Sequence, residues 1–339
     1  MKKWIWVLVL VLILFINPNK INMLSKNNSV GKDIKLIKDI EVNDDIKYEK
    51  YDDDIVLCND KKIMVIDSNG EIISKLDINK EISEYNMYSN HYIDIVNKKD
   101  NRAFSINKKG QTLFGNDVLP ETILYTSVNQ DRFVTSYKNK NKEYIKIQDI
   151  EESIINTIEI TGKVIHLDVV GEYIVVADIQ TNSTVQSEII IYDQNGNQQK
   201  GRSFEDIIID LITTDENIYL VFENYISVLD TKLNEKYKID VNKIKDINKN
   251  EDNTIGIIDN SKKLIELSGK EGKNIKIKQD VIGSQKIGKD YITYSEYSIY
   301  NKDNKEIAKF EEKIKDVVYL GKKNIMIYFD KHIKLFKIS

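Results

Sequence analysis

Oxygen-bearing side chains form the clusters in this sequence that most suggest chemistry. Aspartate fills positions 52–54, and the sequences DSNG at 67–70 and DQNG at 193–196 bring further carboxylate and amide groups together. Calcium takes six to eight oxygen ligands, and a loop site of the EF type also needs later carboxylates and a bidentate glutamate. Those later ligands are absent from both glycine-ending sequences. We therefore interpret 67–70 and 193–196 as hairpin turns in which Asp and Asn bond to their own backbone, and keep 52–54 as the candidate for a cation contact.

The three histidines and the single cysteine offer little for metal or nucleophilic chemistry. His91, His166 and His332 fall in different segments with no shared spacing, whereas a metal site needs ligands that converge. Cys58 has no second cysteine and no nearby histidine, which favours a small buried side chain over a reactive thiol. The GxSxG sequence of serine hydrolases is absent. The sequence therefore predicts no catalytic, metal-binding or cofactor-binding residue, and no cofactor.

Four tyrosines, Tyr291, Tyr294, Tyr297 and Tyr300, recur every three residues. Their strand-like surroundings and the intervening Ser295 and Glu296 place them in a hairpin, where packing between sheets explains them more simply than a shelf for a ligand. Paired carboxylates for glycoside chemistry stay open as an alternative, because the distance between two acids is not visible in a sequence.

The elements that position these residues come from a repeated strand-turn-strand unit. It reads IMVIDSNGEII from Ile63, AFSINKKGQTL from Ala103 and IIIYDQNG from Ile189, and returns in looser form elsewhere. The polar residues that close the repeated strand lie about 40 residues apart; they are Asp67, Asn107, Gln148, Asp193, Asp230, Ser268, Asn301 and Lys337. A period of this length built from short strands indicates a β-propeller.

The body of the chain, residues 33–339, reads as one all-β propeller domain. Continuous apolar runs such as those at 218–222 and 325–329 suit strands covered on both faces by neighbouring sheets. The last unit lacks an outer strand, and the alternating stretch 34–42 can supply it, which would pair the two ends of the domain. Counted this way the propeller has eight blades, with seven as the alternative.

The N-terminal residues form a predicted targeting segment. Two lysines precede an unbroken apolar run from Trp4 to Ile16, a pattern that the export machinery recognises. As a helix this run would span about 20 Å, less than the roughly 30 Å of a bilayer core, which favours a cleaved signal peptide. No small-residue cleavage site follows closely, however, and tryptophans at 4 and 6 suit a membrane interface. We predict an uncleaved hydrophobic helix and anchor at 1–16, followed by a flexible spacer at 17–32, and keep cleavage and secretion as the alternative.

Charge and composition narrow the classes of partner. The chain has a net charge of −4 although residues 1–32 contain lysines and no acid, so the body is acidic. An acidic body lacks the basic footprint of a nucleic-acid-binding protein, and we exclude nucleic acid as a partner. A single cysteine excludes an internal disulfide framework.

The repeat resembles those of WD40-like and quinoprotein-like propellers, and the anchor followed by a propeller resembles a group of membrane-anchored β-propeller proteins from firmicute bacteria. Both tryptophans lie in the N-terminal run, so the body has neither the Trp-Asp dipeptide nor a tryptophan-docking repeat. The anchor at 1–16 predicts an N-terminus in the cytoplasm and a propeller at the outer side of the cell membrane. We expect a non-catalytic protein-interaction or scaffold module of the cell envelope with a protein partner. The alternative is a propeller enzyme, or a carbohydrate- or ligand-binding module, that uses the central channel.

Overall fold

The computed structural model describes residues 33–42, 46–59, 62–77, 85–89, 93–97, 102–115, 122–128, 132–149, 151, 153–181 and 184–339. The anchor predicted at 1–16 and the spacer predicted at 17–32 lie outside these ranges. Within them every regular element is a β-strand. No helix in the described ranges has both the length and the apolar character that crossing a membrane requires.

The strands of the described residues pair into eight antiparallel sheets of four strands each. Sheets 1 to 4 are β2–β5, β6–β9, β10–β13 and β14–β17. Their bounds are β2 Lys47–Tyr51, β3 Asp54–Asn59, β4 Lys62–Ile66, β5 Ile72–Asp77, β6 Tyr85–Ser89, β7 Ile93–Asn97, β8 Arg102–Ile106, β9 Thr112–Gly115, β10 Thr122–Val128, β11 Arg132–Asn139, β12 Lys142–Asp149, β13 Ile154–Ile160, β14 Lys163–Val170, β15 Tyr173–Gln180, β16 Gln186–Asp193 and β17 Gln198–Phe204.

Sheets 5 to 7 are β18–β21, β22–β25 and β26–β29, and sheet 8 joins β30, β31 and β32 to β1. Their bounds are β18 Asp210–Thr213, β19 Asn217–Val221, β20 Tyr225–Asp230, β21 Glu235–Asp240, β22 Ile244–Lys249, β23 Ile255–Asp259, β24 Lys263–Leu267, β25 Gly272–Lys276, β26 Gly283–Ile287, β27 Asp290–Tyr294, β28 Ser298–Tyr300, β29 Glu306–Lys309, β30 Asp316–Tyr319, β31 Asn324–Tyr328, β32 His332–Ile338 and β1 Ile34–Glu41. Eight is the larger of the two numbers that the sequence allowed.

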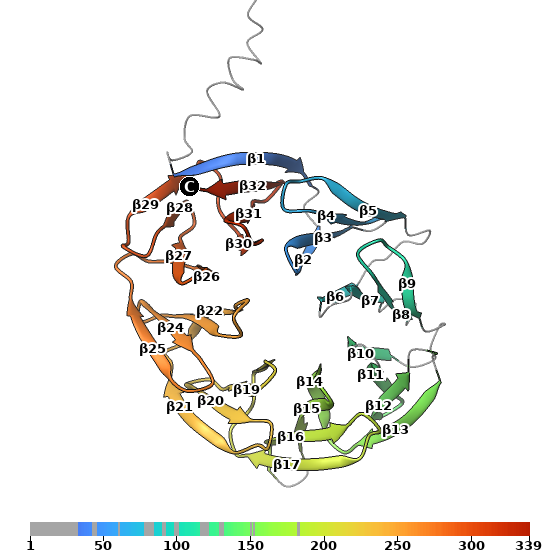
Figure 1. The fold of residues 1–339 in the computed structure, drawn as a ribbon. Coiled ribbons are helices and arrows are strands. Elements are labelled where there is room, and N and C mark those ends of the chain that lie inside the picture. Colours follow the sequence, from blue (N-terminus) through green and yellow to red (C-terminus); the bar gives the residue numbers. More distant parts are fainter. Residues whose placement is uncertain are drawn as a thin grey trace, which may run out of the picture.

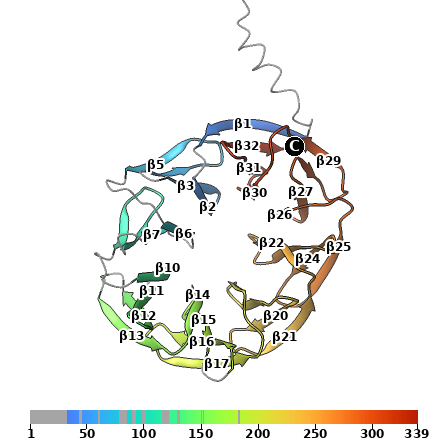
Figure 2. The same ribbon diagram turned by 180° about the vertical axis from the view of Figure 1, so that it is seen from behind.

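The sheets stand side by side around a common centre and close into a ring (Figure 1). The first strand of each sheet lies nearest the centre and the last lies at the rim, which the view from behind also shows (Figure 2). Each hydrophobic cluster draws on two neighbouring sheets; one joins Val134 and Ile145 of sheet 3 to Ile174 and Val176 of sheet 4. The core is therefore a series of layers between sheets, as the continuous apolar runs of the sequence predicted.

The ring closes where the two ends of the domain share sheet 8. Strand β1 pairs antiparallel with β32, from Ile34 opposite Ile338 to Glu41 opposite His332. The backbone NH of Ser339 also donates to the carbonyl of Asp33 at 2.9 Å. The predicted donation of an outer strand by residues 34–42 is confirmed, and it removes an open sheet edge.

Most turns between third and fourth strands share one hydrogen-bonded geometry, whereas the turn at Ser268 is one residue shorter. In the turn at Asp193, the carboxylate accepts from the backbone NH groups of Asn195 and Asn197, each at 2.9 Å. The turn at Asp67 repeats this pattern with the NH groups of Asn69 and Glu71. Asp and Asn therefore cap their own backbone, as the sequence predicted.

The third repeat is one residue out of the predicted alignment. The capping group there is Asp149, whose carboxylate accepts from the NH of Ser153 at 2.8 Å, and Gln148 lies inside β12. The prediction placed the turn residue at Gln148 because only the polar character of that position was visible. The residue after Gln148 is Asp149, and its carboxylate accepts from the backbone NH groups two and four residues further along the chain.

The antiparallel order gives the disc two different loop faces. The turn face carries the connections from first to second strand and from third to fourth strand of each sheet. The linker face carries the connections from second to third strand and the links from one sheet to the next.

Candidate functional site

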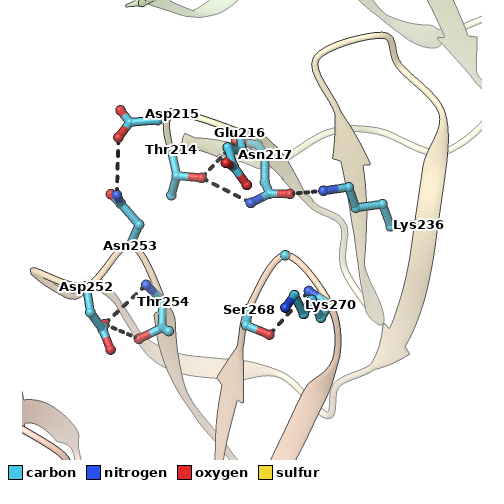
Figure 3. A pocket seen from close by; sticks show the side chains of 11 residues that line it. Thr214, Asp215, Glu216, Asn217, Lys236, Asp252, Asn253, Thr254, Ser268 and Lys270 are labelled. Carbon is cyan, nitrogen blue, oxygen red and sulfur yellow. Dashed lines mark hydrogen bonds between the residues drawn. The ribbon is translucent and has the colours of Figure 1, made fainter.

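A polar pocket of about 420 Å³ opens on the turn face between sheets 5 and 6 (Figure 3). Sheet 5 contributes the turn that joins β18 to β19 and one residue of β21, and sheet 6 contributes the turns on either side of the β23–β24 pair. The lining residues are Thr214, Asp215, Glu216, Asn217, Lys236, Asp252, Asn253, Thr254, Ser268, Gly269 and Lys270. None of them is aromatic, so the pocket offers hydrogen bonds and charges rather than a stacking surface.

Asn217 holds the outer part of the pocket in place. Its amide nitrogen donates to the Thr214 hydroxyl at 3.4 Å, and Lys236 Nζ donates to its amide oxygen at 2.5 Å. The turn of sheet 6 comes so close that a Cβ on Gly269 would lie 2.7 Å from the Asn217 amide nitrogen. A side chain at this position would therefore displace the Asn217 amide, which glycine leaves in place.

The inner part of the pocket is closed by contacts between the two sheets. Asn253 donates to the Asp215 carboxylate at 3.3 Å across the gap, as Figure 3 shows. Asp252 accepts from the Thr254 hydroxyl and from Lys286 Nζ, each at 2.6 Å. Burial alone would raise the pKa of Asp252, but these two donors outweigh it and the pKa is lowered.

The pocket is a mixed-charge surface, with carboxylates on Asp215, Glu216 and Asp252 and ammonium groups on Lys236 and Lys270. Several of these groups already bond to their neighbours, so a ligand would exchange hydrogen bonds within an existing network. Across the part of the chain that the structure describes, no three His, Cys, Asp or Glu side chains gather as a metal site would need. The arrangement suits a small polar ligand.

Carboxylates also brace the inner strands around the centre of the ring. Asp316 of β30 accepts from the Tyr48 hydroxyl at 2.7 Å and the Tyr294 hydroxyl at 2.8 Å, which links sheet 8 to both neighbours. Asp246 of β22 accepts from Asn248 at 2.6 Å and from the NH of Ser284 in sheet 7 at 2.9 Å. Burial, assisted by the nearby charge of Asp316, raises the pKa of Asp246 to about 7.

These central carboxylates are engaged in joining sheets. Each accepts hydrogen bonds from a neighbouring sheet, and for Asp316 the donors are the hydroxyls of the half-buried Tyr48 and the buried Tyr294. A general acid or base needs a lone pair or proton directed at a substrate. The raised pKa of Asp246 is thus explained by its place between two sheets, and it identifies no catalytic group.

The link from sheet 4 to sheet 5 exposes apolar side chains on the linker face. We call residues 205–210, of sequence EDIIID, the isoleucine loop. Ile207 is 38% exposed and Ile209 is 62% exposed, whereas Ile208 between them is buried at 1%. Val185, in the turn between β15 and β16 on the same face, is 58% exposed.

The comparisons with known proteins identify the fold. No protein-family model matches the sequence, and no curated protein matches it. The solved structure of BamB from Moraxella catarrhalis is similar over 90% of this chain and 98% of its own, with 10% identity and a TM-score of 0.57. The computationally designed Ika8 protein is similar over 89% of this chain and 98% of its own, with 11% identity and a TM-score of 0.62. Sqt1 of Saccharomyces cerevisiae covers 92% of this chain and 99% of its own, with 8% identity and a TM-score of 0.55. The chain is a β-propeller.

The two histidines that the structure describes, His166 and His332, lie in different blades of the propeller. His166 of β14 lies with Nδ1 3.8 Å from the Asp210 carboxylate and its ring 6.4 Å from that of Tyr125. His332 of β32 lies 3.0 Å from the Asp39 carboxylate on β1. His91 lies outside the described residues. The structure brings His166 and His332 to different blades, and no shared site contains them.

Two of the three aspartates proposed for a cation contact, Asp52 and Asp54, form ion pairs with a lysine of the neighbouring blade. Lys108 Nζ lies 3.0 Å from the Asp52 carboxylate and 2.9 Å from that of Asp54, and 5.0 Å from the centre of the Tyr51 ring. This cluster therefore fastens blade 1 to blade 2 of the propeller.

Cys58 is completely buried, as its isolation in the sequence predicted. The tyrosine series lies in the predicted hairpin of β27 and β28, and Tyr291 and Tyr294 are buried. Tyr297 departs from the packing prediction, because it is 45% exposed at the turn of that hairpin. Residues in turns are exposed even when their side chains are aromatic. The three-residue spacing of the tyrosines did not reveal that Tyr297 lies in the turn.

Two features of the propeller were not singled out from the sequence. The polar pocket is formed by turns about 40 residues apart in the sequence, and its residue types are common in any turn. No local sequence pattern therefore identifies it. The isoleucine loop does carry a signal: three isoleucines between acids, at a position where the repeat calls for a link between blades. Exposed apolar residues that lie close together can mark a contact surface.

Proposed function

We propose that this protein is a non-catalytic protein-interaction module of the cell envelope, held at the membrane by its N-terminal segment with the propeller outside the cytoplasm. The carrying observation is the pair of exposed isoleucines, Ile207 and Ile209, on one loop face of a closed ring. Exposed apolar groups that a fold keeps in place are typical of contact surfaces. The shared fold with other propellers supports a role in binding, since a propeller displays loops on a rigid frame.

The proposed location rests on the sequence of residues 1–16. Lysines followed by an apolar run and by no close cleavage site favour an anchor that stays attached. A spacer of polar residues at 17–32 would separate the propeller from the lipid.

The location is tested by fractionating cells that make the whole chain or a variant lacking residues 2–16. We expect the whole chain in the membrane fraction and degraded when protease is added to intact cells with a permeable wall. The shortened variant should stay in the soluble fraction and resist protease. A chain in the culture medium that has lost its N-terminal segment would establish the secreted alternative, and whole chain in the cytosol would refute an envelope role.

The interaction is tested by placing a photo-crosslinking amino acid at position 209 in one variant and at 154 in another. Ile154 is a matched control because it is 64% exposed on β13, an outer strand of another blade. We expect a discrete crosslinked product in envelope membranes from position 209 and none from 154. Identical patterns from both positions would show that the isoleucine loop is not a contact surface.

A second candidate function is the binding of a small polar ligand, and the pocket between blades 5 and 6 supports it. Amino acids and monosaccharides are suitable probes for saturation-transfer NMR, because the lining offers both charges and hydrogen bonds. Binding that Lys270→Glu abolishes and Lys289→Glu retains would establish a ligand role. The absence of transfer from both classes would leave the pocket as an ordinary gap between turns.

A further inference from the structure

The isoleucine loop is held firmly, so its apolar side chains are displayed by a fixed backbone. The NH of Ile208 donates to the Ser187 hydroxyl at 2.9 Å, and the NH of Ile209 donates to the carbonyl of Val221 at 2.8 Å. The side chain of Ile208 packs in the core between blades 4 and 5. Because the loop is ordered before it binds, a partner would not need to supply the free energy of ordering it.

Carboxylates surround the exposed isoleucines. Glu205 and Asp206 precede them and Asp210 follows, while Glu223 lies in the neighbouring turn between β19 and β20. The Tyr225 hydroxyl donates to the Asp206 carboxylate at 2.7 Å and so holds that turn against the loop. Glu205, Asp206 and Glu223 are all exposed.

A lysine beside this group is already engaged with an aromatic ring. Lys238 Nζ lies 3.2 Å from the centre of the Tyr225 ring, on which it is held by cation–π attraction. Burial and the Asp206 carboxylate raise the pKa of the Tyr225 hydroxyl, so it stays protonated and donates to Asp206. The four carboxylates outnumber this one ammonium group, so the surface around the isoleucines carries an excess of negative charge.

We infer that the isoleucine loop binds a cationic amphipathic segment of a partner protein, with apolar side chains on Ile207 and Ile209 and lysines or arginines opposite Glu205 and Glu223. This inference rests on the proposed interaction function and names the class of partner. Apolar contact at the centre with complementary charge at the rim is the usual anatomy of a protein interface. An acidic surface repels anionic lipid, which makes a peptide the better occupant.

The first experiment measures binding of four fluorescent synthetic peptides of 18 residues by anisotropy with the purified propeller. Three share one amphipathic pattern of leucines and carry lysine, glutamine or glutamate as the polar residue, and the fourth carries lysine with serine in place of leucine. We expect the lysine–leucine peptide to bind at least tenfold more tightly than the other three. Its affinity should fall severalfold when the salt concentration rises from 50 to 500 mM, because exposed charges are screened.

The second experiment separates the apolar from the charged contribution with paired variants. Ile207→Ser with Ile209→Ser should weaken the lysine–leucine peptide at least tenfold, and Ile154→Ser with Ile72→Ser serves as the control of equal apolar loss. Glu205→Lys with Glu223→Lys should weaken it about tenfold, whereas Glu172→Lys on the turn face should leave it unchanged. Circular dichroism melting of each variant confirms that the propeller is folded.

The outcomes distinguish this inference from the proposed function. If crosslinking at position 209 captures a partner but the two Glu→Lys changes do not alter peptide affinity, the interaction function stands and the cationic partner is wrong. Equal binding of the glutamine and lysine peptides leads to the same conclusion. A dimer by light scattering that the two Ile→Ser changes dissolve would identify a second copy as the occupant. Isoleucine-dependent binding to phosphatidylcholine vesicles would identify a lipid surface instead, and either result would overturn the inference.

Discussion

At the scale of single residues, a central aspartate joins two blades and also makes the free energy of unfolding depend on pH. Asp246 accepts from the NH of Ser284 in the next blade and from Asn248 in its own strand, yet burial raises its pKa to about 7. In the unfolded chain an aspartate has a pKa of about 4. Between these values the folded protein binds more protons at this position than the unfolded chain does, so stability falls as the pH rises from about 4 to 7.

We predict that Asp246→Asn removes most of this pH dependence. The wild type should lose on the order of 2–4 kcal/mol of unfolding free energy between pH 4 and pH 8 through this one group, and the neutral amide should not. Urea unfolding at several pH values measures the difference between the two slopes. Burial also raises the pKa of Asp178 to about 6, so Asp178→Asn should remove a further part of the slope in the same direction. Parallel slopes for wild type and Asp246→Asn would contradict the prediction.

At the same scale, sequence reasoning succeeded where a residue acts on its own neighbours. The caps at Asp67 and Asp193 follow from local spacing, and the burial of Cys58 follows from its apolar strand. It could not foresee Lys108 between Asp52 and Asp54, because that contact joins residues more than 50 positions apart in two blades. The candidate pocket has the same origin, since Asn217 and Gly269 meet only after blades 5 and 6 pack.

At the scale of elements, the turns between third and fourth strands fix the register of each blade. The carboxylate of Asp193 accepts two NH groups, and Gly196 adopts a φ of 81° that completes the turn. We predict that Asp193→Ala costs about 1–2 kcal/mol, because two NH groups lose an acceptor. Asp303→Ala, an exposed turn position in blade 7, is the control and should cost less than about 0.5 kcal/mol. Equal losses by urea unfolding would show that the cap contributes nothing.

Glycine in the hairpin turns of the turn face meets two separate requirements, which one variant in the turn between β14 and β15 and one in the turn between β16 and β17 can separate. Gly171 has a φ of 56° and nothing within 4 Å of the position of a Cβ. Gly196 also has a positive φ, but a Cβ there would lie 2.7 Å from the Asn156 amide nitrogen and 3.0 Å from Ile147. We expect Gly171→Ala to cost about 1 kcal/mol from backbone strain alone, and Gly196→Ala to cost at least about 2 kcal/mol because neighbours must also move. A smaller loss for Gly196→Ala than for Gly171→Ala in thermal melts would refute this order.

At the scale of the whole molecule, the sequence predicted the ring and its closure because the same strand pattern returns at a regular period. Weak strands such as Ser298–Tyr300 are recognised by their place in the period, even though three residues alone would predict nothing. The sequence did not predict which face of the ring exposes apolar side chains. Which loops share a face follows from the alternation of antiparallel strands, but which face exposes isoleucine depends on how the link at 205–210 leaves blade 4.

The two ends of the domain meet within sheet 8, so the pairing of β1 with β32 should stabilise the ring. Removing residues 33–42 takes away β1 with its buried residues Ile34 and Val42, and leaves β32 as an open edge. We expect this deletion to cost about 3–6 kcal/mol and to promote association, measured by thermal melting and light scattering. The control keeps every strand: a circular permutant that joins Ser339 to Asp33 through a short linker and starts at Glu172, in the turn after β14. It should melt within a few degrees of the unpermuted domain, because no contact inside a blade is lost. If the permutant unfolds while the deletion does not, the pairing of β1 with β32 is not what holds the ring together.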